Sequence, residues 1–295
     1  MSGTRIKRIQ YISAMAAFGT IGVFVRAIPL TSSAIAFCRA VMATLLLLCV
    51  FSVRRKNPFS GVSARDLILL FLSGAAMGGN WIFLFEAYEY TSVSLATLGY
   101  YTAPIIVTVL SPVFFREKLF AMEIICFVGS TLGIALITVS SGIGGGSSDG
   151  LGIFLSLCAA ALYATVIMLN KSIKTIGGLE RTLIQFISAS VALLPYVLLS
   201  GGIEFSALNG WSVGALLTVG LIHTGLFYCL YFGAIPHLGG QEAALLSYID
   251  PLVAVFLSLA VLGENMTLLE IVGGAIILIF TLINEIYKKK RKPNA

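Results

Sequence analysis

The chain has 295 residues, of which 58% are hydrophobic and only 11% are charged, and its mean hydropathy is +0.98. Soluble domains carry roughly 25% charged residues, so this composition excludes a soluble enzyme or binding module. The formal net charge of +6 would suit a nucleic acid, but the positions of the Lys and Arg residues between apolar runs indicate membrane topology instead. We therefore expect an integral membrane protein in a lipid bilayer, with no nucleic-acid partner.

Ten apolar runs follow one another along the chain, each close to the roughly 20 residues that an α-helix needs to cross a hydrocarbon core. They cover residues 9–27, 33–53, 66–88, 93–115, 120–140, 150–170, 180–200, 211–233, 240–262 and 268–287. A basic start precedes the first run, as in a signal peptide, but the run is too long for one and a second run follows closely. The sequence therefore predicts an all-α protein of ten transmembrane helices, the first of them uncleaved.

The basic residues alternate between the two sides of these ten predicted helices. Segments on the side of the N-terminus hold 17 of the 19 Lys and Arg residues, whereas the connections near 89–93, 140–150, 200–211 and 262–268 hold none. Cytoplasmic loops carry an excess of basic residues, so we expect both termini in the cytoplasm and a bacterial inner membrane as the location. Only Arg26 and Arg39 depart from the pattern.

An internal repeat relates the two halves at a constant offset of 147 residues. Without gaps it pairs Tyr101 with Tyr248, Pro104 with Pro251 and Glu117 with Glu264. Each copy contains five predicted spans, and an odd number reverses the orientation of the second copy. We expect a first repeat at 1–140, a Gly/Ser linker at 141–149, an inverted second repeat at 150–287 and a basic cytoplasmic tail at 288–295.

Three stretches carry a specific resemblance: AAFGTIGVFVRAIPLTSSAIAFCRA at 16–40, EAYEYTSVSLATLGYYTAPIIVTVLSPVFFREKL at 86–119 and LSYIDPLVAVFLSLAVLGE at 246–264. They are similar to the drug/metabolite transporter superfamily, in particular its ten-helix bacterial EamA branch. The resemblance covers nearly the whole chain. It implies two inverted five-helix repeats around a cavity lined mainly by the third, fourth, eighth and ninth helices, and similar members exchange substrate for protons.

Candidate substrate-binding residues lie on these spans and on the second one. Aromatic rings with an apolar body and a polar tip suit such a cavity, although interfacial belts explain some of them, including Tyr88 and Tyr90. The residues that we assign to substrate binding are Trp81, Tyr101, Tyr231, Tyr248 and Arg39. For Arg39 two interpretations are open: a cation for a substrate carboxylate, or a snorkelling or structurally paired side chain with a partner such as Glu86 or Glu89.

Asp250 and His223 are the candidates for proton coupling. Asp250 lies about ten residues, roughly 15 Å, into its helix and matches Ala103 of the other copy, so this carboxylate exists on one side of the pseudo-axis only. His223 is near the middle of the eighth span, in line with Phe227 and Tyr231. A structural pairing inside the bundle remains the alternative for both.

The repeat-matched prolines and glutamates have simpler interpretations. Pro104 and Pro251 each remove a backbone donor from a predicted helix, which makes them packing kinks or hinges beside the cavity. Glu117 and Glu264 come just before the next helix of their copy, so we expect them to cap helices that start near 120 and 267. Arg26 is expected at the membrane interface and Glu242 at a polar helix start.

The sequence predicts a secondary active transporter. No P-loop, HExxH, GxSxG or GxGxxG motif stands in its required context, so we expect no catalytic residue, no metal and no cofactor. The leading hypothesis is alternating-access export of small amphipathic metabolites, such as amino acids, in exchange for protons, by a monomer or homodimer. Nucleotide sugars, phosphorylated metabolites or amphipathic drugs are alternative substrates, and a membrane-embedded lipid-phosphate handling protein is the alternative of another class.

Overall fold

The computed structural model describes residues 2–115, 118–143, 149–173, 176–234, 237–238 and 240–291, and these residues form helices and their connections. The elements are α1 Ser2–Arg26, α2 Ser32–Val53, α3 Ala64–Tyr90, α4 Val93–Tyr100, α5 Ala103–Phe115, α6 Ala121–Ile143, α7 Asp149–Lys171, α8 Gly178–Leu199, η1 Phe205–Ala207, α9 Gly210–Leu217, η2 Thr218–Leu226, α10 Phe227–Ala234, α11 Gly240–Ser247, α12 Ile249–Ala260 and α13 Leu268–Arg291. The predicted all-α class is confirmed.

By length and composition, eight helices of the described residues can cross a membrane. They are 5–26, 32–53, 64–90, 93–115, 149–171, 178–199, 210–234 and 268–287, and two shorter apolar helices, 121–137 and 249–260, complete the predicted order. Predicted and observed spans agree within a few residues, except that α1 begins at Ser2 and not near residue 9. Glu117 and most of the expected linker, residues 144–148, lie outside the described residues.

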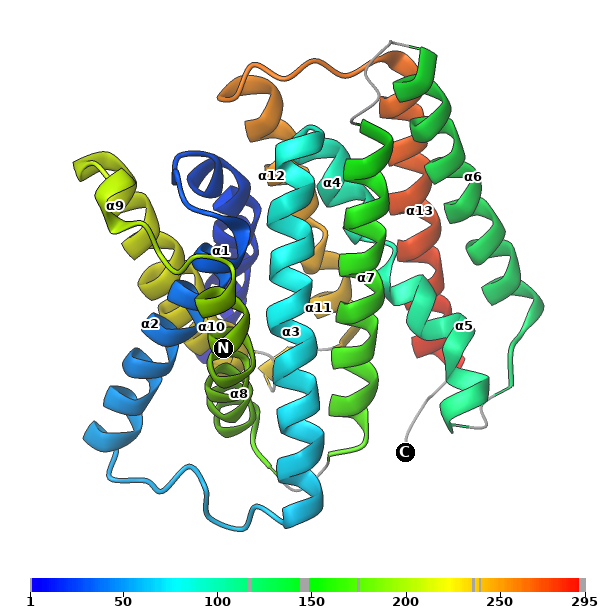
Figure 1. The fold of residues 1–295 in the computed structure, drawn as a ribbon. Coiled ribbons are helices and arrows are strands. Elements are labelled where there is room, and N and C mark those ends of the chain that lie inside the picture. The colour runs from blue at the N-terminus through cyan, green and yellow to red at the C-terminus, as the bar shows by residue number, and fades with distance from the viewer. Residues whose placement is uncertain are drawn as a thin grey trace.

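Successive helices run back and forth between two ends of the bundle (Figure 1). The α2–α3 and α7–α8 connections lie at the lower end in this view, which we call the basic end because Arg54, Arg55 and Lys56 follow α2 there. The α3–α4 and α12–α13 connections lie at the upper end. We call it the acidic end because four carboxylates, Glu89, Asp149, Glu264 and Glu270, line one pocket beside these connections.

Two predicted spans are broken near their middle, at matching positions of the two repeats. The span 93–115 consists of α4 and α5 with a turn at Tyr101–Thr102, and the span expected at 240–262 consists of α11 and α12 with a break at Tyr248. The sequence left a kink or a hinge open at each proline, and the structure has a break in both helices. Pro104 and Pro251 each lie in the first turn of the second segment, where a backbone donor has no helical acceptor to lose.

Close backbone contacts hold α1 against the broken helices. A methyl group on Gly19 would lie 2.5 Å from the carbonyl oxygen of Asp250, and one on Gly22 would lie 2.4 Å from a methyl of Val93. Glycine lets helices approach in this way inside a membrane, where packing replaces the hydrophobic effect. The first helix of one repeat thereby contacts α4 of its own copy and α12 of the other.

A second glycine contact joins α6 to α13, the fifth helices of the two copies. A methyl on Gly133 would lie 2.7 Å from the Gly273 carbonyl oxygen, and a methyl on Gly273 would lie 2.7 Å from the Gly133 carbonyl oxygen. The two backbones therefore touch directly at their crossing. These helices lie together at one side of the bundle (Figure 1).

Candidate functional site

The two broken helices meet through one polar contact. The phenol of Tyr101, at the α4–α5 break, donates a hydrogen bond of 2.5 Å to Oδ2 of Asp250, in the first turn of α12. The ring of Tyr248, at the other break, lies 6.4 Å from that of Tyr101 between centroids. Three of the residues singled out in the sequence are thus brought together across the repeat axis.

Aromatic rings surround this contact on the side of α7, α10 and α1. Tyr100 lies 5.3 Å from Tyr163 of α7, and Tyr231 of α10 stacks on Tyr11 of α1 at 5.4 Å. Asp250 is half-buried, and Tyr163 is 36% exposed. A row of tyrosines from α4 and α7 thus continues from the Tyr101–Asp250 contact.

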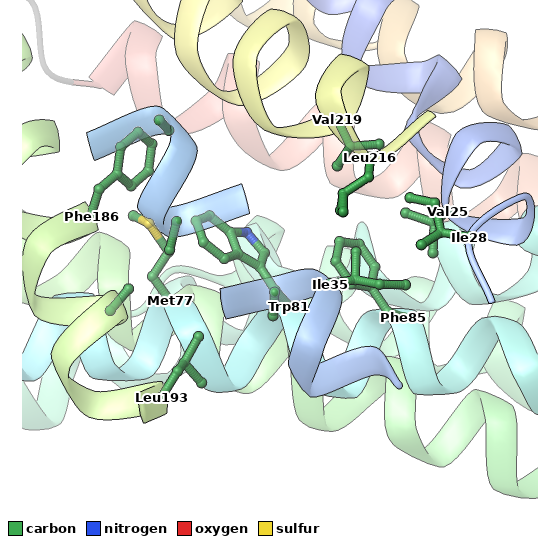
Figure 2. Close-up of a cluster of buried hydrophobic side chains, with 14 of the residues drawn as sticks. Val25, Ile28, Ile35, Met77, Trp81, Phe85, Phe186, Leu193, Leu216 and Val219 are labelled. Carbon is green, nitrogen blue, oxygen red and sulfur yellow. The ribbon is translucent and has the colours of Figure 1, made fainter. Parts of the chain in front are cut away.

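Arg39 is fully inside the bundle, with 3% of its surface exposed. Its guanidinium carbon lies 4.2 Å from the ring centre of Trp81 and 5.3 Å from that of Phe85, and its Nε donates to Oγ1 of Thr224 at 3.0 Å. Figure 2 shows the Trp81 and Phe85 rings within the buried cluster that Leu216 and Val219 also join. A desolvated cation over aromatic rings gains about 2 kcal/mol. The snorkelling interpretation is therefore wrong.

His223 is held by neutral groups in a segment of unusual helix. Residues Thr218–Leu226 form a π-helix, in which the Thr224 hydroxyl donates to the Val219 carbonyl at 2.7 Å, five residues back. The Nδ1 of His223 lies 3.2 Å from the Thr218 carbonyl oxygen and its Nε2 lies 2.7 Å from the Thr20 hydroxyl. Both ring nitrogens thus have partners, and within the described residues no hydrogen bond or ring contact joins His223 to Asp250.

Glu264 is the centre of contacts at the acidic end. Its carboxylate accepts the backbone N–H of Val93, at 3.2 Å and 2.9 Å to its two oxygens, as well as the Ser258 hydroxyl. Arg26 donates to Glu264 at 3.1 Å and to the Thr91 carbonyl at 2.8 Å. The expected cap of its own next helix is wrong, because Glu264 instead caps α4 of the other repeat.

Helix α13, which Glu264 was expected to cap, is capped by other residues. Thr267 N–H donates to Glu270 Oε2 at 2.7 Å, and Glu270 N–H donates to Thr267 Oγ1 at 3.2 Å, so these two residues satisfy the start of α13 reciprocally. A pocket of about 370 Å³ opens beside this helix start, and Arg26, Glu89, Asp149, Glu264 and Glu270 are among its lining residues. Arg26 is thus part of a paired polar end and not a free interfacial cation.

At the basic end, α1 is tied to α11. Arg8 forms an ion pair with Glu242, in the first turn of α11, and the Tyr11 hydroxyl donates to the Ala243 carbonyl at 3.0 Å. The polar helix start expected of Glu242 is present, together with a partner that the sequence did not indicate. One helix, α1, therefore contacts the ninth span at the basic end and the fourth span, through Gly22 and Val93, toward the acidic end.

Comparison with known proteins identifies the family to which this architecture belongs. The sequence profile of the EamA-like transporter family matches residues 8–139 and again residues 150–285. The chain belongs to the EamA-like transporter family.

Relatives of this EamA-like transporter share most of its length. It is 31% identical over 276 residues to the uncharacterized transporter YxxF of Bacillus subtilis (strain 168), and the aligned region covers 92% of this chain and 86% of that protein. An uncharacterized transporter of Archaeoglobus fulgidus is 28% identical over 90% of this chain and 91% of that protein. One crystal structure, at 15% identity and a TM-score of 0.61 over 99% of this chain and 100% of that chain, shares the fold.

Several residues of the transporter's interior were not foreseen. Tyr163 and Tyr11 have no aromatic counterpart at the 147-residue offset, so the repeat gave no signal for them. Thr224, the acceptor for Arg39, depends on a π-helix that no residue spacing indicates. Tyr88 was assigned to an interfacial belt but is 4% exposed, so that assignment is wrong, while Tyr90 is 37% exposed.

Proposed function

We propose that this EamA-like transporter is a secondary active carrier that exports small amphipathic metabolites, such as amino acids, in exchange for protons by alternating access. The observation that carries the proposal is the pair of deep ionisable groups, Arg39 and Asp250, each held by neutral partners. Within the described residues neither forms a salt bridge. A charge at membrane depth is costly unless an opposite charge meets it, and a substrate can supply that charge.

Arg39 suits a carboxylate. The Trp81 ring lies against the guanidinium group, and the hydrogen bond that Arg39 makes within the described residues uses Nε, so the two terminal nitrogens are the groups that a planar anion would contact. Tyr228 interacts electrostatically with both Arg39 and Asp250, which supports a single binding region that contains the two charges. A small zwitterion with an apolar side chain matches this arrangement of cation, rings and carboxyl group.

Asp250 suits exchange of a proton for substrate. Its carboxyl group can hold a proton or contact a substrate ammonium group, and the two occupants exclude one another. Because Tyr101 of the first repeat donates to this carboxyl group of the second, its occupancy acts on the contact between the two copies. Pro104 and Pro251, at the start of the second half-helices, are the proposed hinges. His223, whose ring contacts the Thr20 hydroxyl of α1, is retained as a second candidate for proton coupling.

The proposed orientation follows from charge. The basic end faces the cytoplasm of a bacterial cell, which puts the acidic end outside the inner membrane. Alternating access then requires separation of α1 from the broken helices at one end at a time. The contacts at stake are Arg26 with Glu264 at the acidic end and Arg8 with Glu242 at the basic end.

Transport by purified protein in liposomes tests the proposal. Vesicles are loaded with a labelled amino-acid mixture, a pH gradient is imposed and efflux is followed, with sugar phosphates, nucleotide sugars and cationic dyes as separate arms. We expect amino-acid efflux that rises with an inward proton gradient and loses this response in Asp250→Asn. Glu204→Gln, at an exposed residue of the connection between α8 and α9, is the control. Efflux with an unchanged pH response in Asp250→Asn combined with His223→Ala would refute proton coupling at this site.

A further inference from the structure

The connection between α2 and α3 carries charges that the proposed transport site does not use. Arg54, Arg55 and Lys56 follow α2 directly, and all three are exposed. The helix has 22 residues and is therefore about 33 Å long, enough to cross a hydrocarbon core of roughly 30 Å. The three cations thus lie at the level of the lipid headgroups, at the basic end, where Figure 1 shows this connection.

The end of α2 fixes the backbone of these residues. The Arg55 N–H donates to the Ser52 carbonyl at 3.1 Å. The Lys56 N–H donates to the Phe51 carbonyl, also at 3.1 Å, which completes the Schellman arrangement of a helix C-terminus. Arg55 occupies the left-handed position of this motif with a φ of 50°, as the one non-glycine residue with positive φ that the structure describes. Glycine is the usual residue there, so an arginine indicates a use for its side chain.

These cations have no carboxylate partner in the described chain. Residues 54–65 contain four Lys or Arg residues and no Asp or Glu. None of the four forms a salt bridge within the part of the chain that the structure describes. The next residue, Asp66, is buried and interacts electrostatically with Arg181 of α8. The connection therefore presents uncompensated positive charge to its surroundings.

Exposed apolar side chains lie on both sides of the three cations. Leu45, Cys49 and Val53 recur every four residues and form an exposed stripe on α2 that ends directly before the cations. Phe59, which is 48% exposed, follows them in the connection, and its N–H donates to the side-chain oxygen of Asn57 at 3.0 Å. Cations between apolar groups match a ligand that has both an anionic headgroup and hydrocarbon chains.

The far end of the connection is held by the bundle. Val62 packs against a buried cluster that includes Leu70 of α3 and Ile184 of α8. The Ser63 hydroxyl oxygen accepts the Asp66 N–H at 3.1 Å and caps α3. Both ends of the connection are thus fixed by contacts of the folded chain, so a ligand need not order this segment in order to bind.

We infer that the α2–α3 connection is a binding site for an anionic phospholipid of the leaflet at the basic end. Arg54, Arg55 and Lys56 contact its phosphate, because adjacent Cα atoms are about 3.8 Å apart and a guanidinium binds phosphate through two parallel hydrogen bonds. The acyl chains lie along the Leu45–Val53 stripe of α2, and Phe59 enters the boundary between headgroups and chains. This site is independent of the transported substrate and of proton coupling.

Thermal unfolding of the full-length protein in an uncharged detergent tests the site. A ligand that binds only the folded state raises the melting temperature, so titration with phosphatidylglycerol gives an apparent affinity. Phosphatidylcholine with the same acyl chains and inorganic phosphate are separate arms. We expect a saturable rise in melting temperature with phosphatidylglycerol and none in the other two arms.

Arg55→Gly separates lipid binding from folding. We expect the apparent affinity for phosphatidylglycerol to fall about fivefold, the effect of one cation near an anionic surface. The melting temperature without lipid should stay at or above that of the wild type, because glycine suits a positive φ. Arg65→Gln is the matched control, since it removes one exposed cation at the start of α3, away from the end of α2.

An unchanged affinity in Arg65→Gln beside a weakened Arg55→Gly supports the site. Equal loss in both variants overturns it, because the lipid then responds only to the overall charge of the basic end. An unchanged affinity in Arg55→Gly overturns it as well. An equal rise in melting temperature with inorganic phosphate makes the ligand a free anion, and an equal rise with phosphatidylcholine removes the role of charge; either result overturns the assignment to an anionic phospholipid.

Discussion

Adding a methyl group at Gly19 is expected to destabilise the contact between α1 and α12. The new Cβ would lie 2.5 Å from the Asp250 carbonyl oxygen and 2.7 Å from the Val253 Cβ, where ordinary contact begins at 3.4 Å. The first of these atoms belongs to the backbone and cannot rotate away, so the helices must separate by close to 1 Å. Overpacking of this kind costs about 1–3 kcal/mol.

Gly214→Ala makes the same substitution at a position where we expect it to stabilise the protein. Gly214 lies inside α9, and a methyl group there meets nothing within 4 Å. Alanine stabilises a helix interior by about 0.5–1 kcal/mol relative to glycine, so this variant should melt at or above the wild-type temperature.

Thermal unfolding in detergent, followed by circular dichroism, measures both variants. At roughly 2–4 °C per kcal/mol for a chain of this order of size, Gly19→Ala should melt about 2–12 °C below wild type. If Gly19→Ala were as stable as Gly214→Ala, the close approach of α1 to the Asp250 backbone would be refuted.

Three further substitutions test the polar contacts by the same melting assay. Glu264→Gln should cost about 1 kcal/mol or more, because Arg26 loses its counter-charge, and Arg26→Gln in the same chain should restore part of the loss. Arg8→Gln should leave the melting temperature unchanged, since its ion pair is exposed to solvent; a clear drop would show that this contact holds the basic end together. Thr224→Val should cost about 1–3 kcal/mol by leaving the Arg39 Nε without an acceptor, and equal loss in Thr224→Ser would contradict that reason.

Apolar run length was enough to predict most of the fold. Helices such as α2 and α8 are mainly apolar segments bounded by polar or glycine residues, so their limits follow from composition. A kink or a hinge was expected at Pro104 and Pro251, but the sequence did not decide between them, because a proline is compatible with both a kinked helix and a new helix start. Which of these occurs depends on neighbours such as Gly19, far away in the chain.

Individual site residues were easier to select than their partners. Asp250 and Tyr101 were both chosen, from membrane depth and from the repeat, but nothing in either motif indicates that one donates to the other. Glu264 was assigned to the helix nearest in sequence, whereas the structure gives it to α4, 171 residues away. Local spacing describes local caps well and says nothing about acceptors that arrive from the other repeat.

The mutual contact of Gly133 with Gly273 has a mechanical consequence. Two helices whose backbones touch at their crossing, with Ile137 and Ile277 packed against the same glycines, cannot slide past one another without a clash. The α6–α13 pair, with one helix from each repeat, can thus keep the same packing while other helices move. Movement between the halves would then fall to α1, α7 and the broken helices, which are also the elements that surround Asp250.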